Sequence, residues 1–232
     1  MAKEYMRRVL DAYIEEHLES MGALLIEGTK WSGKTRTAKQ FAKSVLPITN
    51  ENQIKALTHM VESGSFGFLD REPPLLIDEW QEVPGIWDAV RFKVDDRGEG
   101  GQFILTGSSV PSEGAVRHSG AGRIAKVTMR PMSLFESKES NGQVSLRELF
   151  ESEPNADGFS ELTLEGITQA IARGGWPGSI GGRSDKAAWT VSRYLRAVID
   201  SDVSRVDGVQ RDAVTVRRIV ESIARNVSTF AS

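Results

Sequence analysis

An eight-residue segment, GTKWSGKT, constrains the fold of this chain more than any other feature. It matches the pattern G-x-x-x-x-G-K-[ST], with Gly28, Gly33, Lys34 and Thr35 at the required offsets. The short apolar run Ala23–Glu27 precedes it and a helical pattern begins at Lys34, so we expect a strand, a glycine-rich turn and a helix in that order. The segment therefore predicts a phosphate-binding loop, and its flanks disfavour a chance match.

The chemistry of such a loop assigns roles to its positions. Glycines let successive backbone N–H groups curl around a β-phosphate, and the positive end of the following helix faces the anion. Lys34 is expected to bridge the β- and γ-phosphates, and Thr35 to hold Mg²⁺. Trp31 either packs the loop against the amino-terminal helix, which we favour, or stacks on a base. The residues expected to contact the nucleotide are Gly28, Thr29, Lys30, Trp31, Ser32, Gly33, Lys34, Thr35 and Arg36.

Two adjacent carboxylates, Asp78 and Glu79, end the apolar run LLIDE (75–79). Neighbours on a strand point to opposite faces, so at its carboxyl end Asp78 can reach a metal ion while Glu79 turns toward the γ-phosphate and orients a water molecule. This division of labour suits nucleotide hydrolysis better than transfer to a small-molecule acceptor. A solvated strand end is the structural alternative, and the preceding apolar residues argue against it.

Three other polar residues are candidates for the same chemistry. Thr106 and Ser108, in FILTGSS (103–109), end another apolar run and are placed to hydrogen-bond the attacking water or the γ-phosphate. Serine and threonine also commonly form turns at strand ends, so for each of these two residues a purely structural role is as well supported as a catalytic one. Arg123 follows a glycine-rich stretch and is a candidate arginine finger in cis or in trans, although a surface role is the favoured interpretation.

Alternating strands and helices predict an α/β fold as far as Pro131. The apolar runs are short and continuous, which is typical of strands buried in a parallel sheet with helices on both faces. The expected strands are 23–27, 75–79, 102–106 and 124–129, and the expected helices are 5–18, 34 to about 46, 51–61 and one beginning at Pro84. Beyond Pro131 the pattern is helical, with candidate helices near 145–152, 163–173, 185–203 and 210–227.

Charge and composition exclude several classes of protein. Lys plus Arg number 29 and Asp plus Glu 32, a net charge of −3, so nucleic acid would have to bind a local basic patch rather than the field of the whole molecule. There is no cysteine, which excludes disulfides, thiol nucleophiles and cysteine–zinc sites. No apolar run reaches the ~20 residues of a membrane span and the amino terminus lacks a secretory signal, so we expect a cytoplasmic protein with no membrane partner.

Five motifs together resemble a known family: GTKWSGKT, LLIDEWQEVP, FILTGSS, GAGRIAKVTMRPMSLFE and RGGWPG. They are similar to prokaryotic P-loop ATPases of the AAA+ type, an archaeal-ATPase-like group whose usually longer members carry a winged-helix segment and an uncharacterised nuclease-like carboxyl-terminal domain. The resemblance implies a P-loop core of the additional-strand, catalytic-glutamate type, followed by a small helical lid. It places ATP phosphates on Gly28, Gly33, Lys34 and Thr35, Mg²⁺ on Asp78, and acid–base catalysis on Glu79. It also likens Gly174, Gly175 and Pro177 to a turn by which the lid approaches base and sugar.

The resemblance implies three parts, a P-loop core (1–136), a helical lid (137–208) and the start of a winged-helix segment (209–232). It implies a Mg²⁺-dependent ATPase that couples its nucleotide state to movement of a carboxyl-terminal partner domain. The alternative is a nucleotide-dependent switch or nucleic-acid-binding regulator with little turnover, and a small-molecule kinase is disfavoured. Nucleic acid, through the carboxyl-terminal part, and other copies of the chain are the further candidate partners. Self-association is suggested by an apolar stripe on the last helix, made of Val216, Ile219, Val220, Ile223 and Val227.

Overall fold

The structure is a computed structural model that describes residues 4–107, 119–151, 157–182, 184–203, 209–227 and 229. The chain divides into two compact units, Met1–Gly181 and Gly182–Ser232, and each is described by itself. The first unit holds the whole sheet and the phosphate loop. Within the described ranges, no helix combines the length and the apolar character needed to cross a membrane.

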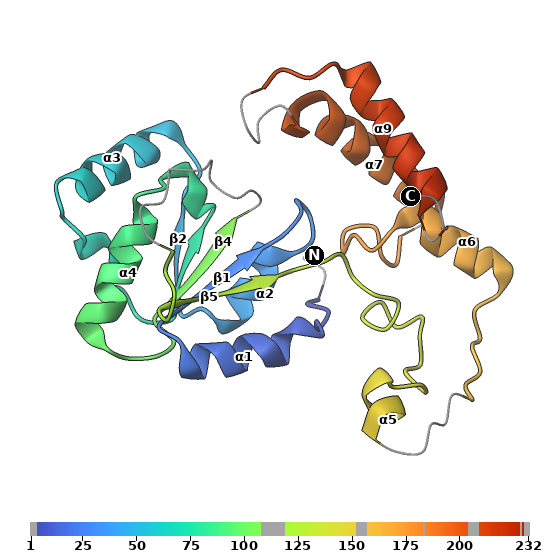
Figure 1. Ribbon diagram of the computed structural model, residues 1–232, viewed down its shortest axis with the longest axis horizontal. Coiled ribbons are helices and arrows are strands. Elements are labelled where there is room, and N and C mark those ends of the chain that lie inside the picture. Colours follow the sequence, from blue (N-terminus) through green and yellow to red (C-terminus); the bar gives the residue numbers. More distant parts are fainter. Residues whose placement is uncertain are drawn as a thin grey trace. The chain divides into compact units, whose positions relative to one another are not determined.

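The first unit is built on a five-stranded parallel sheet in the order β2–β3–β4–β1–β5 (Figure 1). Its strands are β1 (Ala23–Glu27), β2 (Ser44–Pro47), β3 (Leu75–Asp78), β4 (Phe103–Gly107) and β5 (Ile124–Thr128). Nearly every residue of β1, β3 and β4 is buried, as expected for strands covered on both faces. Because β4 lies between β1 and β3, the predicted additional-strand core is confirmed.

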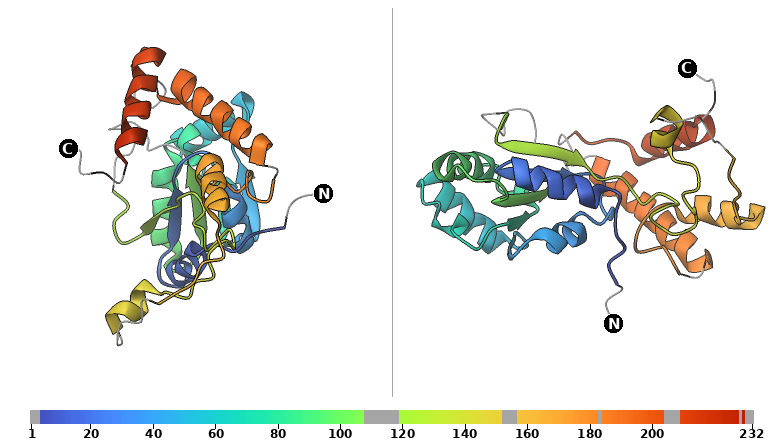
Figure 2. Two further views of the ribbon diagram at one scale, coloured as in Figure 1. Left: turned by 90° about the vertical axis from the view of Figure 1, so that its right-hand side faces the viewer. Right: turned by 90° about the horizontal axis from the view of Figure 1, so that it is seen from below.

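Helices cover both faces of this sheet (Figures 1 and 2). α1 (Leu10–Ser20) and α2 (Lys34–Phe41) pack on one face, in a core that contains Ile14, Ala38, Leu24, Ile26, Leu76 and Ile104. α3 (Glu51–Glu62) and α4 (Ile86–Arg97) cover the other face, in a core that contains Leu57, Trp87, Trp80, Leu25, Ile77 and Leu105. Successive strand residues alternate between the two cores, so the predicted layering of helices, sheet and helices is confirmed.

The second strand of the sheet corrects a sequence prediction. The periodicity predicts that the helix after the loop continues to about Leu46, but α2 ends at Phe41 and the chain enters β2. The backbone N–H of Lys43 donates to the Pro74 carbonyl at 3.0 Å, which begins the pairing of β2 with β3. A short apolar run fits a helical face and a strand equally well, so periodicity alone does not decide. Pro47 is tolerated because β2 is an edge strand.

The amino-terminal helix also begins later than its periodicity predicts. The pattern indicates a helix over 5–18, whereas α1 starts after a non-helical segment. In that segment the Tyr5 hydroxyl lies 3.1 Å from Thr37 Oγ1 of α2, within hydrogen-bond distance, and Arg8 donates to the Ser32 carbonyl of the loop. These tertiary hydrogen bonds override the local helical pattern and hold the segment against the loop.

The remaining predicted helices and strands are found within a few residues of their expected bounds. Two short turns complete the sheet domain, η1 (Gly67–Leu69) and η2 (Trp80–Glu82). After β5 the described elements are helical: α5 (Leu146–Glu151) and α6 (Leu164–Arg173) in the first unit, and α7 (Ser184–Ala197), the π-helical turn η3 (Val198–Asp202) and α9 (Ala213–Asn226) in the second. The helical region predicted beyond Pro131 is therefore confirmed, while the division after residues 136 and 208 stays a prediction.

Replacing Ile14 by Ala should destabilise the first unit, because Ile14 is 0% exposed in the core between α1 and the sheet. We expect the free energy of unfolding to fall by about 2–5 kcal/mol in urea titrations. Val9→Ala is the matched control, since that side chain is 65% exposed and its loss should change stability by less than about 0.5 kcal/mol. Equal effects of the two substitutions would contradict the packing of α1 on the sheet.

Candidate functional site

Three parallel strands bring the predicted site residues to one edge of the sheet. The register aligns Thr106 of β4 with Ile26 of β1 on one side and with Asp78 of β3 on the other. The loop that follows β1 therefore starts beside Asp78 and Thr106. The order of strands also reverses at β1, and such a switch point is where ligands bind in open α/β sheets.

The shape of the loop depends on the two glycines that the phosphate-loop pattern requires. Gly28 has φ 145°, and a Cβ atom there would lie 2.2 Å from the carbonyl oxygen of Met129. Gly33, which directly precedes α2, has φ 102°. Side chains rarely adopt either conformation, so the loop requires glycine at both positions. Glycine at these two positions thus gives the loop the backbone conformation that the predicted cradle needs.

Lys34 lies buried at the start of α2, with 6% of its surface exposed. Its Nζ donates to the carbonyl oxygens of Gly28 at 2.9 Å and Thr29 at 3.0 Å, which holds the ammonium across the loop. Burial lowers the pKa of Lys34, and the carboxylates of Glu79 and Asp78 oppose this effect. The site therefore holds a desolvated cation for which a polyphosphate would be a favourable partner.

The Asp78 carboxylate accepts two hydroxyl groups from neighbouring elements. Thr35 Oγ1 donates to Asp78 Oδ1 at 2.8 Å, and Thr106 Oγ1 donates to the same oxygen at 2.5 Å. Hydroxyl and carboxylate oxygens are hard ligands of the kind that Mg²⁺ takes together with phosphates and water. Thr35 and Asp78 thus fit the predicted metal site, and Thr106 adjoins it.

Glu79 turns away from the strand in a left-handed conformation, with φ 59° and ψ 47°. Gln81 Nε2 donates to Glu79 Oε2 at 2.5 Å, and the buried amide oxygen, Gln81 Oε1, has no partner within the described part of the chain. A Cβ atom on Gly107 would lie 2.6 Å from Gln81 Oε1, so glycine at the end of β4 admits this side chain. Sequence reasoning missed Gln81, and its place two residues after Glu79 was the one available signal.

The other predicted loop residues differ in exposure. Ser32 is fully buried, and its hydroxyl has no hydrogen-bond partner among the residues that the structure describes. Thr29, Lys30 and Arg36 are exposed around the loop. Trp31 has φ 65° and is 58% exposed. The choice between packing of its ring on the protein and stacking on a base stays a prediction.

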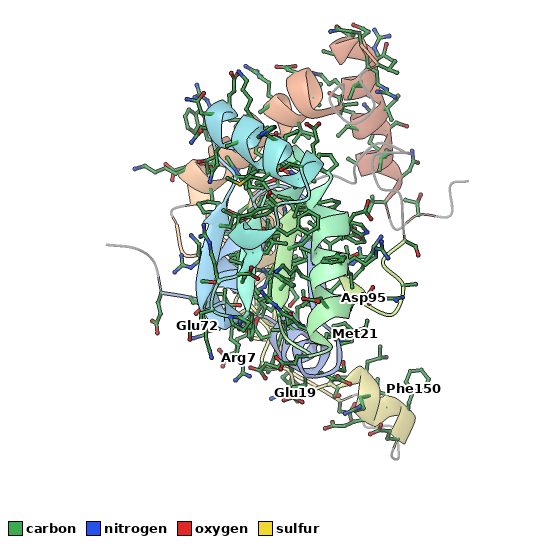
Figure 3. The ribbon with its side chains drawn as sticks, turned by 90° about the vertical axis from the view of Figure 1, so that its left-hand side faces the viewer. Arg7, Glu19, Met21, Glu72, Asp95 and Phe150 are labelled. Atoms are coloured by element: carbon green, nitrogen blue, oxygen red, sulfur yellow. The ribbon has the colours of Figure 1, made fainter. Side chains whose placement is uncertain are left out.

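Arg123 does not join the phosphate loop. It precedes β5 at the edge where strands begin, and Arg123 Nε donates to Asp95 Oδ1 at 2.8 Å. Figure 3 labels Asp95 and Met21 at this edge of the molecule. A five-residue strand at about 3.3 Å per residue separates it from the site, which contradicts a finger role in cis. A role in trans stays a prediction, and the prediction for Ser108 lies outside the described residues.

A cavity of about 220 Å³ adjoins the loop on the side of the amino-terminal segment. Its lining includes Gly33 and Arg36, Tyr5 and Met6 from the segment before α1, and Met132 and Pro177 from the chain beyond β5. The Gly175 carbonyl accepts the Met132 N–H at 2.7 Å, and a Cβ atom on Gly175 would lie 2.2 Å from the Met132 carbonyl oxygen. This close backbone approach places the predicted glycine–proline turn at the cavity.

Sequence reasoning also missed a buried ion pair beneath the loop. Arg8 Nε donates to Glu136 Oε1 at 2.9 Å, with the two side chains only 4% and 8% exposed. Burial alone would raise the pKa of Glu136, but hydrogen bonds from Ser133, Val9 and Arg8 together hold this pKa below its ordinary value of 4.5. Nothing in the local sequence around Arg8 or Glu136 signals the pairing, because 128 positions separate the two residues.

The fold and this site define a nucleotide-binding domain of the P-loop ATPase type. Residues 20–138 match the AAA domain family, and residues 164–232 match a domain of unknown function (DUF8612). The first match spans half of the chain, and the chain belongs to the AAA domain family. The predicted resemblance to AAA+-type ATPases is therefore confirmed, while the winged-helix and nuclease-like parts stay predictions.

Two mycobacterial proteins are similar over most of the chain. Uncharacterized protein Rv2008c of Mycobacterium tuberculosis and uncharacterized protein Mb2031c of Mycobacterium bovis are each 26% identical over 226 residues, which cover 91% of this chain and 43% of the relative. The chain thus spans less than half the length of these relatives. Among solved structures, the Walker-type ATPase PABY2304 of Pyrococcus abyssi aligns with a TM-score of 0.49 and 15% identity, over 87% of this chain and 75% of that chain.

The Glu136 carboxylate should make the free energy of unfolding depend on pH in the acid range. Because its pKa in the folded protein lies below the ordinary value, its contribution is present above pH 4.5 and is lost as the pH falls through the lowered pKa. We expect Glu136→Gln to flatten the decline in the free energy of unfolding between neutral pH and about pH 3. Urea unfolding of both proteins at a series of pH values measures this, and parallel declines would contradict it.

Proposed function

We propose that this protein binds ATP and hydrolyses it with Mg²⁺ at the edge formed by β1, β3 and β4. The observation that carries the proposal is the convergence of four groups there. Lys34 crosses the loop, the hydroxyl of Thr35 and the carboxylate of Asp78 are 2.8 Å apart, and Glu79 follows directly. A cation, a hard oxygen pair and an adjacent carboxylate are the components that phosphoryl transfer to water requires.

Each residue has a distinct task in this proposal. The loop N–H groups and Lys34 bind and orient the β- and γ-phosphates, so that binding energy holds the nucleotide for in-line attack. Thr35 and Asp78 hold Mg²⁺, which when bound neutralises charge on the phosphates. Glu79 orients a water molecule and accepts its proton, while Thr106 fixes the Asp78 carboxylate.

The cavity beside Gly33 is the proposed site of the base and sugar. Its mixed polar and apolar lining and its position next to the loop support this assignment. Pro177 and Gly178 line it, in agreement with the role that the family resemblance gives to the glycine–proline turn. The proposal also includes movement of a carboxyl-terminal partner domain, the three-part division after residues 136 and 208, and contacts with nucleic acid or with further copies of the chain.

The alternative function is a nucleotide-dependent switch with little turnover, and one observation favours it. The carboxylate of Glu79 already accepts a hydrogen bond from Gln81, which restricts its freedom to orient a water molecule. Comparing nucleotide affinity with the rate of phosphate release separates the two functions. Tight binding with negligible release, in the presence and absence of DNA or RNA, would favour the switch.

Lys34→Ala and Glu79→Gln should affect different steps. Removing the Lys34 ammonium deletes charge-assisted bonds to phosphate, so we expect ATP affinity in calorimetric titrations to fall at least tenfold, which corresponds to about 1.5–3 kcal/mol per such bond. Glu79→Gln is nearly isosteric and should keep ATP affinity but lower kcat by about 10²–10⁴-fold. Unchanged affinity of a folded Lys34→Ala protein would refute the phosphate loop, and a wild-type rate of Glu79→Gln would make Glu79 a bystander.

Asp78→Asn should be impaired through the metal ion. An amide is a weaker Mg²⁺ ligand than a carboxylate, so raising the Mg²⁺ concentration should restore part of the lost activity of this variant. The same increase should leave Glu79→Gln unchanged, because that variant lacks a base rather than a metal ligand. Titrating Mg²⁺ in phosphate-release assays gives both profiles, and identical profiles would contradict the assigned roles.

A further inference from the structure

The Arg8 side chain lies buried beneath the phosphate loop, with only 6% of the residue exposed. Each of its guanidinium nitrogens has an acceptor: Nη1 donates to the Ser32 carbonyl at 2.8 Å, Nη2 to the Arg130 carbonyl at 2.8 Å, and Nε to Glu136 Oε1 at 2.9 Å. One of these acceptors belongs to the loop itself. The other two belong to the segment after β5, which anchors the guanidinium from behind.

The bond to Ser32 bears on the peptide unit that precedes α2. The Ser32 carbonyl and the Gly33 N–H belong to one planar trans peptide, in which they point in opposite directions. Gly33 has φ 102° and no side chain, so little steric resistance opposes rotation of this peptide. With the carbonyl held by Arg8, the Gly33 N–H faces away from the guanidinium. The orientation of a loop donor is thus set from outside the loop.

We propose that Arg8 is a positioning residue that fixes the Ser32–Gly33 peptide so that the loop presents its N–H groups to a polyphosphate. This inference rests on the proposed nucleotide binding and deepens it. The planar guanidinium holds three acceptors at fixed angles, which a lysine ammonium on a flexible stem does not reproduce. The backbone of Arg8 is held as well, because its N–H donates to Asp11 Oδ2 at 3.0 Å.

A second set of hydrogen bonds fixes the same segment to α2. The Tyr5 hydroxyl donates to Asp11 Oδ1 at 2.7 Å and lies 3.1 Å from Thr37 Oγ1, one turn into the helix that begins at the loop. Burial raises the pKa of the Tyr5 hydroxyl, so it stays protonated and available as a donor. The segment before α1 therefore contacts the loop and its helix at two separate points, and these contacts hold the backbone that carries Arg8.

The test is the binding of inorganic tripolyphosphate with Mg²⁺, measured by calorimetry on the whole chain. Tripolyphosphate occupies a phosphate loop but not a nucleoside cavity, which Arg8 also lines. We expect Arg8→Met to lower the affinity for tripolyphosphate and for ATP alike by about tenfold or more, because that is the effect of losing a hydrogen bond to a charged group. Arg8→Lys should restore only part of the lost affinity. Arg97→Met is the matched control, because Arg97 is an ion-paired arginine on α4 that donates to Asp70. It should bind within about twofold of the wild type.

Two further measurements separate positioning from structural support. Glu136→Gln keeps an acceptor for Arg8 Nε and leaves the Ser32 bond intact, so its tripolyphosphate affinity should stay near that of the wild type. In ¹H–¹⁵N spectra, tripolyphosphate should shift the Gly33 amide resonance of the wild type and not that of Arg8→Met at the same concentration. Thermal unfolding of each variant confirms that it is folded under the conditions of the titration.

Four results would overturn the proposal. A folded Arg8→Met protein that binds tripolyphosphate as the wild type does would remove the positioning role and leave the proposed function standing. An equal loss in Glu136→Gln would assign the effect to the ion pair, and a loss confined to ATP would assign it to the nucleoside cavity. If the wild type binds neither ATP nor tripolyphosphate, the proposed function itself fails, and this inference fails with it.

Discussion

Parallel pairing of β4 between β1 and β3 is the constraint on which the site depends. The register aligns Asp78, Thr106 and Ile26 across three strands, so the metal-binding carboxylate, the supporting hydroxyl and the start of the loop coincide at one edge. A slip of one residue would turn Asp78 to the opposite face of the sheet and would exchange the apolar side chains of β3 between the two cores. The buried cores on both faces thus fix the register, and the register fixes the chemistry.

Close backbone approaches complete the site where side chains would not fit. At Gly28 the loop passes so close to the end of β5 that a Cβ atom would lie 2.2 Å from the Met129 carbonyl oxygen. Gly107 leaves room for the Gln81 amide at the end of β4. Gly175 does the same for the turn beyond β5, against Met132. Each glycine brings two segments together that are distant in sequence, so the site is assembled from the whole length of the sheet domain.

The sequence predicted those parts of the structure whose signals are local. The phosphate loop, Asp78 and Glu79 follow apolar strands at fixed spacing, and their proximity at one edge follows from parallel strands alone. Tyr5 and Arg8 were predicted wrongly, because their segment has a helical periodicity while its conformation is determined by hydrogen bonds to residues distant in sequence, Thr37 and Ser32. Arg123 shows the same limit, since proximity in sequence to a glycine-rich stretch does not determine the edge of the sheet at which a residue lies.

The buried pair of Arg8 and Glu136 has a physical effect other than stabilising the fold. Removing both charges from water is costly, and an apolar pair of similar volume often stabilises a fold as well or better. Each of the three guanidinium nitrogens nevertheless donates a hydrogen bond, and two of the three acceptors are backbone carbonyls at 2.8 Å. Backbone carbonyls cannot be held in one direction by apolar packing, because such packing is not directional. The physical effect that only this network supplies is therefore the orientation of the peptide groups, among them the one that leads into α2.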